Sequence, residues 1–234
     1  MRLAVLKAMN AARSNRRAGV MITRLPDGAQ RFVEATEVAA DPLSEVLEAA
    51  LRAGKSGLVT LEGVDHFLTV QAPSPRLTLI GAVHIAQALA PMARIAGLDV
   101  TIIDPRTAFA TPERFPDTPI IAQWPEEPLK AEPPDRYTAM CLLTHDPKID
   151  DPALKIALGS DCFYIGALGS KKTHAKRLER MRAQGFVEAA LARIRAPIGL
   201  DIGAVSPAEI AVAILGEIVA ALRKKPLRSE SPAR

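Results

Sequence analysis

The 234-residue sequence has few cysteines, few aromatic residues and no long apolar run, and each shortage excludes a class of protein. Cys141 and Cys162 are too few for a disulfide scaffold, lack neighbours at metal-ligand spacing and indicate a reducing compartment. One tryptophan and two tyrosines leave few rings for stacking on bases. No stretch approaches the roughly 18 apolar residues of a membrane helix, and the first residues return to charge too early for a secretory signal. We therefore expect a cytoplasmic protein that holds no metal and binds neither membranes nor nucleic acid.

The basic charge is concentrated at one end of the chain. The formal net charge is +4, and residues 223–234 carry five Lys or Arg and one Glu, which also gives +4. The preceding residues therefore balance at zero, which weakens the case for nucleic-acid binding further. Hydrophobic residues make up 48% of the sequence, enough to build real cores. We expect a folded body followed by a disordered basic tail, residues 223–234.

Residues 1–72 are predicted to form a small α+β domain. A Pro-Asp-Gly turn at 26–28 separates two strand-like stretches, and the Glu-Gly pair at 62–63 separates two more. The Asp-Pro pair at 41–42 has the cap-plus-proline pattern that begins a helix. The Pro-Ser-Pro stretch at 73–75 is a stiff linker that ends this domain.

The stretch from Arg76 to Arg106 organises the rest of the chain. Leu77 to Ile80 is an apolar run typical of a buried parallel strand, and Gly81 follows where the backbone must turn into a helix. A second strand ends at Asp104, 104 − 81 = 23 residues after the glycine. This spacing is close to the roughly 20 residues at which a carboxylate meets a ribose hydroxyl in dinucleotide-binding units.

The dinucleotide-binding pattern is imperfect. In G-x-G-x-x-G/A the chain supplies Gly81, Val83 and Ala86, so a valine stands where a missing side chain lets a pyrophosphate approach the backbone. The unit either binds a phosphate-bearing ligand or is kept for packing alone. Arg106 has the same two interpretations, a phosphate contact or a surface loop charge.

Further strands are predicted at residues 120–121, 137–144 and 162–166. His145 and Asp146 follow the strand at 137–144, at the carboxyl end where open α/β sheets bind ligands. Residues 124–134 are proline-rich and predicted to be irregular. The Asp-Pro pair at 151–152 is predicted to begin the next helix.

A second glycine turn follows the strand at 162–166. It contains Gly166 and Gly169, and Ser170 is a predicted N-cap whose helix would offer free amides and a positive dipole to an anion. Lys171 and Lys172 near this helix start favour an anion. For the more distal cations, a solvated face and an anion site are equally good interpretations; these are Lys176, Arg177, Arg180 and Arg182.

The clearest local signal is a capping box. Ser206 is followed by Pro207 and, three residues on, by Glu209, ahead of an apolar helical period. The predicted fold class is therefore α/β, with a Rossmann-like parallel sheet in a C-terminal domain, residues 76–222, and a smaller α+β N-terminal domain.

Several motifs together resemble the XdhC/CoxI family, the maturation factors of xanthine and carbon-monoxide dehydrogenases. They are GAVHIAQAL (81–89), IDPR (103–106), ATPERFP (110–116), LTHD (143–146), YIGALGSKKTHAKRLERM (164–181) and PIGLDIGAVSPAEIAVAILGEI (197–218). The resemblance implies a protein that binds molybdenum cofactor, supports its sulfuration with a cysteine desulfurase as donor, and inserts it into a xanthine dehydrogenase-type molybdoenzyme. It also implies a histidine after the glycine turn, where His84 stands.

The sequence departs from that family in two places. Family members commonly have glycine where this chain has Val83, and their N-terminal domain carries a segment like SGGCVE, for which residues 1–75 have no counterpart. We interpret Cys141 and Cys162 as core residues. If the family's cysteine is needed for sulfur transfer, this short form uses one of these two or carries no sulfur itself.

Three hypotheses follow. In the first, a delivery protein holds the cofactor with residues Gly81, Val83, His84, Asp104, Arg106, His145, Asp146, Gly166, Gly169, Ser170 and Lys171. In the second, an NAD(P)-dependent oxidoreductase uses Asp104 for the ribose and His145 or His174, with Asp146 nearby, for proton transfer. In the third, the chain is a scaffold with a vestigial pocket. A homodimer is left open, because no residue pattern argues for it.

Overall fold

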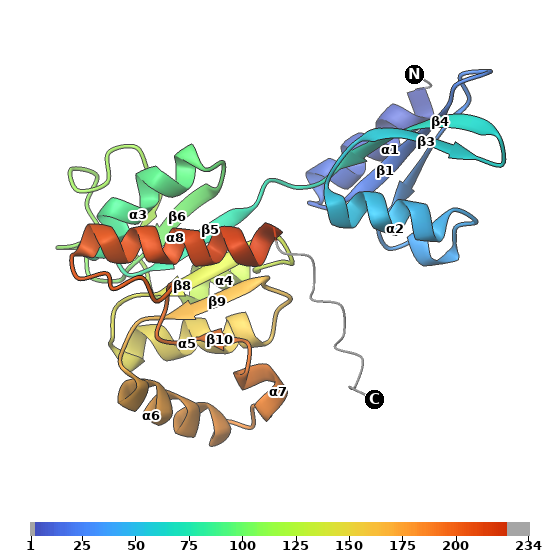
Figure 1. Ribbon diagram of the computed structural model, residues 1–234. Helices are drawn as coiled ribbons and strands as arrows, with labels where there is room; N and C mark the ends of the chain where they lie inside the picture. Colours follow the sequence, from blue (N-terminus) through green and yellow to red (C-terminus); the bar gives the residue numbers. More distant parts are fainter. Residues whose placement is uncertain (1–2, 224–234) are drawn as a thin grey trace. The chain divides into compact units, whose positions relative to one another are not determined.

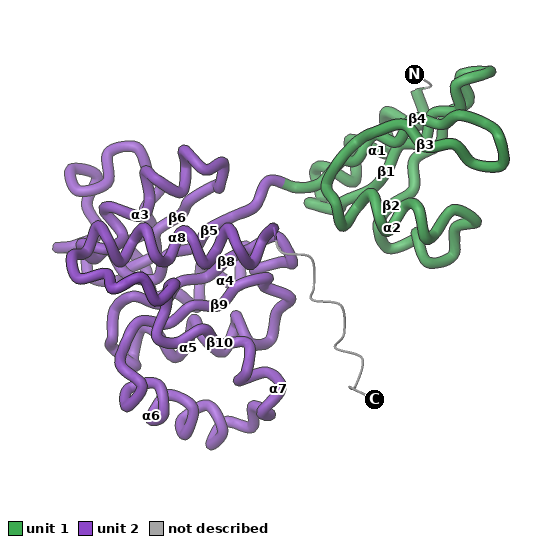
Figure 2. Tube along the Cα trace, viewed as in Figure 1, with its two compact units in different colours: residues 1–73, 225–234 green, residues 74–224 purple. Residues whose placement is uncertain are grey.

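The computed structural model describes residues 3–223 and divides into two compact units that meet in sequence at residues 73 and 74 (Figure 2). Each unit has its own hydrophobic core and is described by itself. The predicted basic tail lies outside the described residues apart from Arg223. In the described part of the chain, no helix is long and apolar enough to cross a membrane.

The first unit is a four-stranded antiparallel sheet with two helices. The strand order is β2-β1-β4-β3. Its elements are α1 (Leu3–Ser14), β1 (Gly19–Arg24), β2 (Gln30–Glu34), a 3-10 turn (Val38–Ala40), α2 (Ser44–Ala53), β3 (Gly57–Leu61) and β4 (Val64–Gln71). The helix predicted to begin at Pro42 begins at Ser44 instead. Asp41 is drawn into a pair with Arg31, and its Oδ1 accepts from the Leu43 amide at 2.9 Å.

The second unit contains a parallel sheet, as predicted, but with six strands rather than the five expected, because Ile194–Arg195 adds a further edge strand. Its strands and helices are β5 (Arg76–Ile80), α3 (His84–Ile95), β6 (Asp99–Ile103), β7 (Ile120–Ile121), α4 (Glu126–Ala131), β8 (Thr138–Leu142), α5 (Pro147–Leu158), β9 (Tyr164–Ala167), α6 (Lys171–Arg182), α7 (Glu188–Leu191), β10 (Ile194–Arg195) and α8 (Pro207–Arg223). The strand order β10-β9-β8-β5-β6-β7 reverses between β5 and β8, which makes this a doubly wound Rossmann-type sheet.

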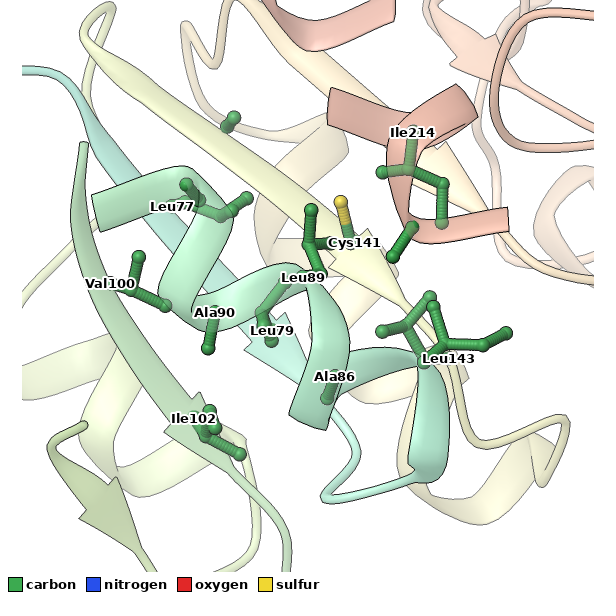
Figure 3. Packing of buried hydrophobic residues seen from close by; sticks show 14 of the residues in the cluster. Leu77, Leu79, Ala86, Leu89, Ala90, Val100, Ile102, Cys141, Leu143 and Ile214 are labelled. Atoms are coloured by element: carbon green, nitrogen blue, oxygen red, sulfur yellow. The ribbon is translucent and has the colours of Figure 1, made fainter. Parts of the chain in front are cut away.

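Helices cover both faces of the parallel sheet (Figure 1). On one face α3 packs against α8, and Figure 3 shows Leu77 and Leu79 of β5 meeting Leu89 of α3, with Ile214 of α8 in the same cluster. On the other face α5 covers the sheet, and α4 and α6 pack against α5. Because both faces are buried, the strands are almost continuously apolar.

Two local predictions in this unit were wrong. The proline-rich stretch 124–134 contains helix α4, since Pro125 is its N-cap residue and Pro128 lies in its first turn, where no intrahelical N–H is needed. Helix α5 begins at Pro147 with Asp146 as its N-cap, and Pro152 lies inside it. The capping box of α8 is confirmed, because the Ser206 amide donates to Glu209 at 2.9 Å and the Glu209 amide donates to Ser206 Oγ at 3.2 Å.

Candidate functional site

The ends of β5 and β8 approach closely at the point where the strand order reverses. Gly81 follows β5 with φ +117°, and a Cβ atom at this position would lie 2.8 Å from Thr144 Cγ2. Only glycine fits both the backbone conformation and the space. Open α/β sheets bind ligands outside their carboxyl ends at such a reversal, so this edge is the candidate site.

The turn between β5 and α3 is held by the rest of the unit. The Ala82 amide donates to Asp104 Oδ2 at 2.7 Å, and the Ala82 carbonyl accepts from Arg114 Nη1 at 3.0 Å. Val83 is the N-cap residue of α3, half-buried and packed against the core beside the sheet. His84, the first residue of α3, is exposed. The turn is therefore fixed in place, with His84 free to meet a ligand.

Asp104 is fully buried at the end of β6, and both its oxygens are used within the chain. Besides Ala82, it accepts from Arg106 Nε at 2.9 Å and from Arg106 Nη2 at 2.7 Å. Burial alone would raise the pKa of Asp104, but the hydrogen bonds from Arg106 and the Ala82 amide hold it below its ordinary value. The carboxylate thus ties β6 to the glycine turn, and its contact with a ribose stays a prediction.

The loop after β6 places a second arginine at the turn, which sequence reasoning did not single out. Arg114 donates from Nη2 to Gln87 Oε1 of α3 at 3.2 Å. Arg106 and Arg114 both lie over the Phe109 ring, with their Cζ atoms 4.7 Å and 5.5 Å from its centroid. The available signal was the ATPERFP motif, which contains Arg114.

The ends of β8 and β9 also meet. His145 has a left-handed backbone with φ +62°, and a Cβ atom on Gly169 would lie 3.7 Å from His145 Nδ1. Ser170 is the predicted N-cap of α6 and accepts from the Thr173 amide at 3.2 Å, and Lys171 is exposed. His145 and the turn at Gly169 and Ser170, which are more than 20 residues apart in sequence, thus lie together at the carboxyl edge of the sheet.

Three other predicted residues have defined places. Gly166 lies inside β9, where a Cβ atom would come within 2.5 Å of Ile198, so its close packing needs glycine. Asp146 caps α5 by accepting from the Lys148 amide at 2.9 Å. His174 lies half-buried on α6. Burial, together with the Arg177 charge, lowers the pKa of His174 as it does that of His145, which favours neutral imidazoles.

A cavity of about 240 Å³ opens between α5, α6 and the end of β8. It is lined by His145, Pro147, Asp150, Lys172, Thr173, Lys176, Arg177 and Arg180. Asp150 and Arg177 are 1% and 2% exposed, respectively. Sequence reasoning did not consider Asp150, and it treated Arg177 only as one of the distal cations of this helix.

Asp150 is expected to make stability depend on pH. Its Oδ1 accepts from Thr144 Oγ1 at 2.7 Å, yet burial outweighs this bond and raises the pKa to about 6. A carboxyl with a raised pKa favours folding most when protonated, so its contribution falls as pH rises from about 4 to about 6. Relative to an Asp150→Asn variant, the wild-type protein should lose roughly 2 to 3 kcal/mol of unfolding free energy over that range. Urea denaturation across the range measures this, and a difference that does not change with pH would contradict it.

Comparisons with known proteins agree with this architecture. The chain is 31% identical over 153 residues to the uncharacterized protein YqeB of Escherichia coli K12, a match that covers 65% of this chain and 28% of YqeB. It is 32% identical over 148 residues to a probable xanthine dehydrogenase subunit from Bacillus subtilis 168, covering 63% of this chain and 43% of that protein. It is also 32% identical over 146 residues to the molybdenum cofactor insertion chaperone PaoD of Escherichia coli K12, covering 62% of this chain and 40% of PaoD.

A crystal structure described as a xanthine dehydrogenase from Bacillus halodurans has the same fold. The TM-score is 0.66 at 20% identity, over 97% of this chain and 66% of that one. The chain spans less than half the length of each of the three curated relatives named above. The model of the XdhC Rossmann domain matches residues 77–218, which are the parallel sheet and its helices. The chain therefore belongs to the XdhC family.

Proposed function

We propose that the protein binds the molybdenum cofactor at the carboxyl edge of the parallel sheet and delivers it to a xanthine dehydrogenase-type molybdoenzyme. The observation that carries this is the close approach of β5 and β8 at Gly81 and Thr144, at the strand-order reversal where open α/β sheets bind ligands. Family membership and the similarity to the molybdenum cofactor insertion chaperone PaoD support the choice of ligand.

Two helix starts at this edge suit the phosphate of such a cofactor. Helices α3 and α6 each begin just after a positive-φ glycine, Gly81 or Gly169, and a helix start offers free amides and a positive dipole to an anion. Lys171 lies exposed at the first position of α6 and adds a positive charge. A ligand held by such contacts can be released again, as delivery requires.

The burial of both cysteines supports the inference that this chain does not carry sulfur covalently. Cys141 and Cys162 are both buried, and burial raises the pKa of each thiol. Because the thiolate is the reactive form, neither is placed to accept a sulfur atom from a donor. We therefore infer that a cysteine desulfurase acts on the bound cofactor, with no cysteine of this chain as an intermediate carrier.

A second candidate is an NAD(P)-dependent oxidoreductase. The Rossmann strand order and the spacing from Gly81 to Asp104 favour it. The engagement of Asp104 by Ala82 and Arg106 counts against it, because a ribose hydroxyl would have to compete with both. His145 at the end of β8 would be the acid or base of such an enzyme.

One preparation distinguishes the two functions. The protein is purified anaerobically from cells that make molybdenum cofactor and denatured, and the released small molecules are assayed for oxidised fluorescent pterin and for NAD(P). We expect about one pterin per chain, and none from a matched strain that cannot make the cofactor. NAD(P) without pterin would overturn the delivery function and favour the oxidoreductase.

A further inference from the structure

The cavity between α5 and α6 contains a buried arginine that the chain leaves partly unbonded. Arg177 is 2% exposed, and its Nη2 donates to the Leu168 carbonyl at 2.8 Å. Among residues 3–223, its Nε and Nη1 atoms have no hydrogen-bond partner, although Arg177 lines the cavity. A buried guanidinium with unsatisfied donors is costly unless something completes it. This arginine therefore points to a ligand that accepts hydrogen bonds and carries negative charge.

The neighbouring cations are compatible with an anionic ligand. Lys172 and Lys176 line the same cavity from α6 and are exposed, so their ammonium groups can move toward a ligand. Arg180 is already engaged, because its Nε and Nη2 donate to Asp151 at 2.6 Å and 3.0 Å. Of the described cations that line this cavity, Arg177 is therefore the one that is buried and still has N–H donors without a hydrogen-bond partner.

Asp150 lines the same cavity from α5, where its charge interacts with that of Arg177, and it sets a limit on the ligand. Its Oδ2 atom has no hydrogen-bond partner among the described residues. An ionised carboxylate here opposes an anion, whereas a protonated one donates a hydrogen bond to it. Removal of this charge should therefore strengthen anion binding.

The cavity borders the candidate site at the carboxyl edge of the sheet, because His145 at the end of β8 lines it. Thr144 connects the two, because its Oγ1 donates to Asp150 at 2.7 Å while its Cγ2 stands against Gly81. The volume of about 240 Å³ is several times the share of one water molecule in the liquid, roughly 30 Å³, so a phosphate group fits.

We propose that this cavity is a phosphate-binding site in which Nε and Nη1 of Arg177 bind the phosphate oxygens, with Lys172 and Lys176 adding attraction. The phosphate is either free inorganic phosphate or the phosphate end of a larger ligand. This assignment needs only the cavity, and it does not depend on which cofactor the sheet edge binds.

Calorimetric titration of the full chain with inorganic phosphate, at constant ionic strength, tests the site. We expect saturable binding of one phosphate, and a loss of affinity of about tenfold or more in Arg177→Gln, because charge-assisted hydrogen bonds are lost. Arg182→Gln is the matched control, since it removes the same charge from the same helix at an exposed residue paired with Glu188, away from the cavity lining. Its affinity should stay within about twofold of the wild type.

Asp150→Asn keeps the test decisive if Arg177→Gln fails to fold. This variant removes the opposing charge, so phosphate should bind several-fold more tightly. The proposal is overturned if wild-type protein binds no phosphate at tens of millimolar, if both arginine variants weaken binding equally, or if Asp150→Asn leaves the affinity unchanged.

A second titration identifies the source of the phosphate. Protein that carries pterin from the anaerobic preparation is titrated in the same way. If the cavity holds the phosphate of the bound cofactor, the loaded protein no longer takes up inorganic phosphate, and if the ligand is the free anion, it still does. Absence of phosphate binding by the empty protein would end this inference and leave the pterin assay of the delivery function unaffected.

Discussion

An Asp104→Ala variant is expected to lose roughly 3 to 4 kcal/mol of unfolding free energy near neutral pH. The change leaves the buried Ala82 amide without its acceptor and the Arg106 guanidinium without its partner. The loss stays below the roughly 5 kcal/mol of a fully buried pair, because the Arg106 side chain is 34% exposed and can be hydrated. Urea denaturation of the full chain measures the loss.

The control and the pH dependence make this prediction specific. Asp99→Ala changes an exposed carboxylate at the other end of β6, and it should cost less than about 1 kcal/mol. Because the pKa of Asp104 is lowered on folding, its contribution is complete above the unfolded pKa near 4 and is lost as the pH falls. The difference between wild type and Asp104→Ala should therefore shrink as the pH is lowered below about 4. Equal losses in the two variants would contradict the tethering role.

A Gly81→Ala variant is expected to lose roughly 3 to 4 kcal/mol of unfolding free energy and, with it, ligand binding at the sheet edge. The residue has φ +117°, which strains any L side chain, and its Cβ atom would lie 2.8 Å from Thr144 Cγ2. The ends of β5 and β8 would have to separate to admit the methyl group. Gly97→Ala is the matched control, since Gly97 has φ +85° but nothing within 4 Å of a Cβ atom, and it should cost about 1 kcal/mol.

A second change separates the clash from the backbone strain. Thr144→Ser removes the Cγ2 atom and keeps the hydroxyl that donates to Asp150. In the Gly81→Ala background it should restore about half of the lost stability, which a double-mutant cycle measures. If the serine variant restores nothing, the loss arises from backbone strain alone and the close approach of the strands is not its cause.

Helix starts show where local sequence rules were sufficient and where they were not. Ser206 and Glu209 satisfy each other's donors, so the beginning of α8 could be predicted from four residues. Two Asp-Pro pairs, at 146–147 and 151–152, fit the cap-plus-proline rule equally well, and the structure uses the first. Asp151 instead binds Arg180, 29 residues away, so the choice depends on tertiary packing that no local rule contains.

The sequence was sufficient to predict the fold and the glycine turns of the candidate site, but not its buried charged residues. The parallel fold and the glycine turns follow from apolar runs and φ-permissive residues, and the structure confirms the fold class. The burial of Arg177 depends on which face of α6 packs against α5. The only local sign was its position four residues before the buried Met181, which places both on one helix face. The four bonds to Asp104 join residues up to 22 positions apart and have no sequence signature.

The two units build their hydrophobic cores from separate stretches of the chain. The cluster around Leu47 is drawn from residues 20–70, whereas the clusters on both faces of the parallel sheet are drawn from residues beyond 76. Because stability comes mainly from the burial of apolar side chains in a contiguous core, the free energy of unfolding of each unit depends mainly on its own core. A destabilising substitution in the core of the first unit is therefore expected to leave the free energy of unfolding of the second unit, which contains Gly81 and Asp104, unchanged.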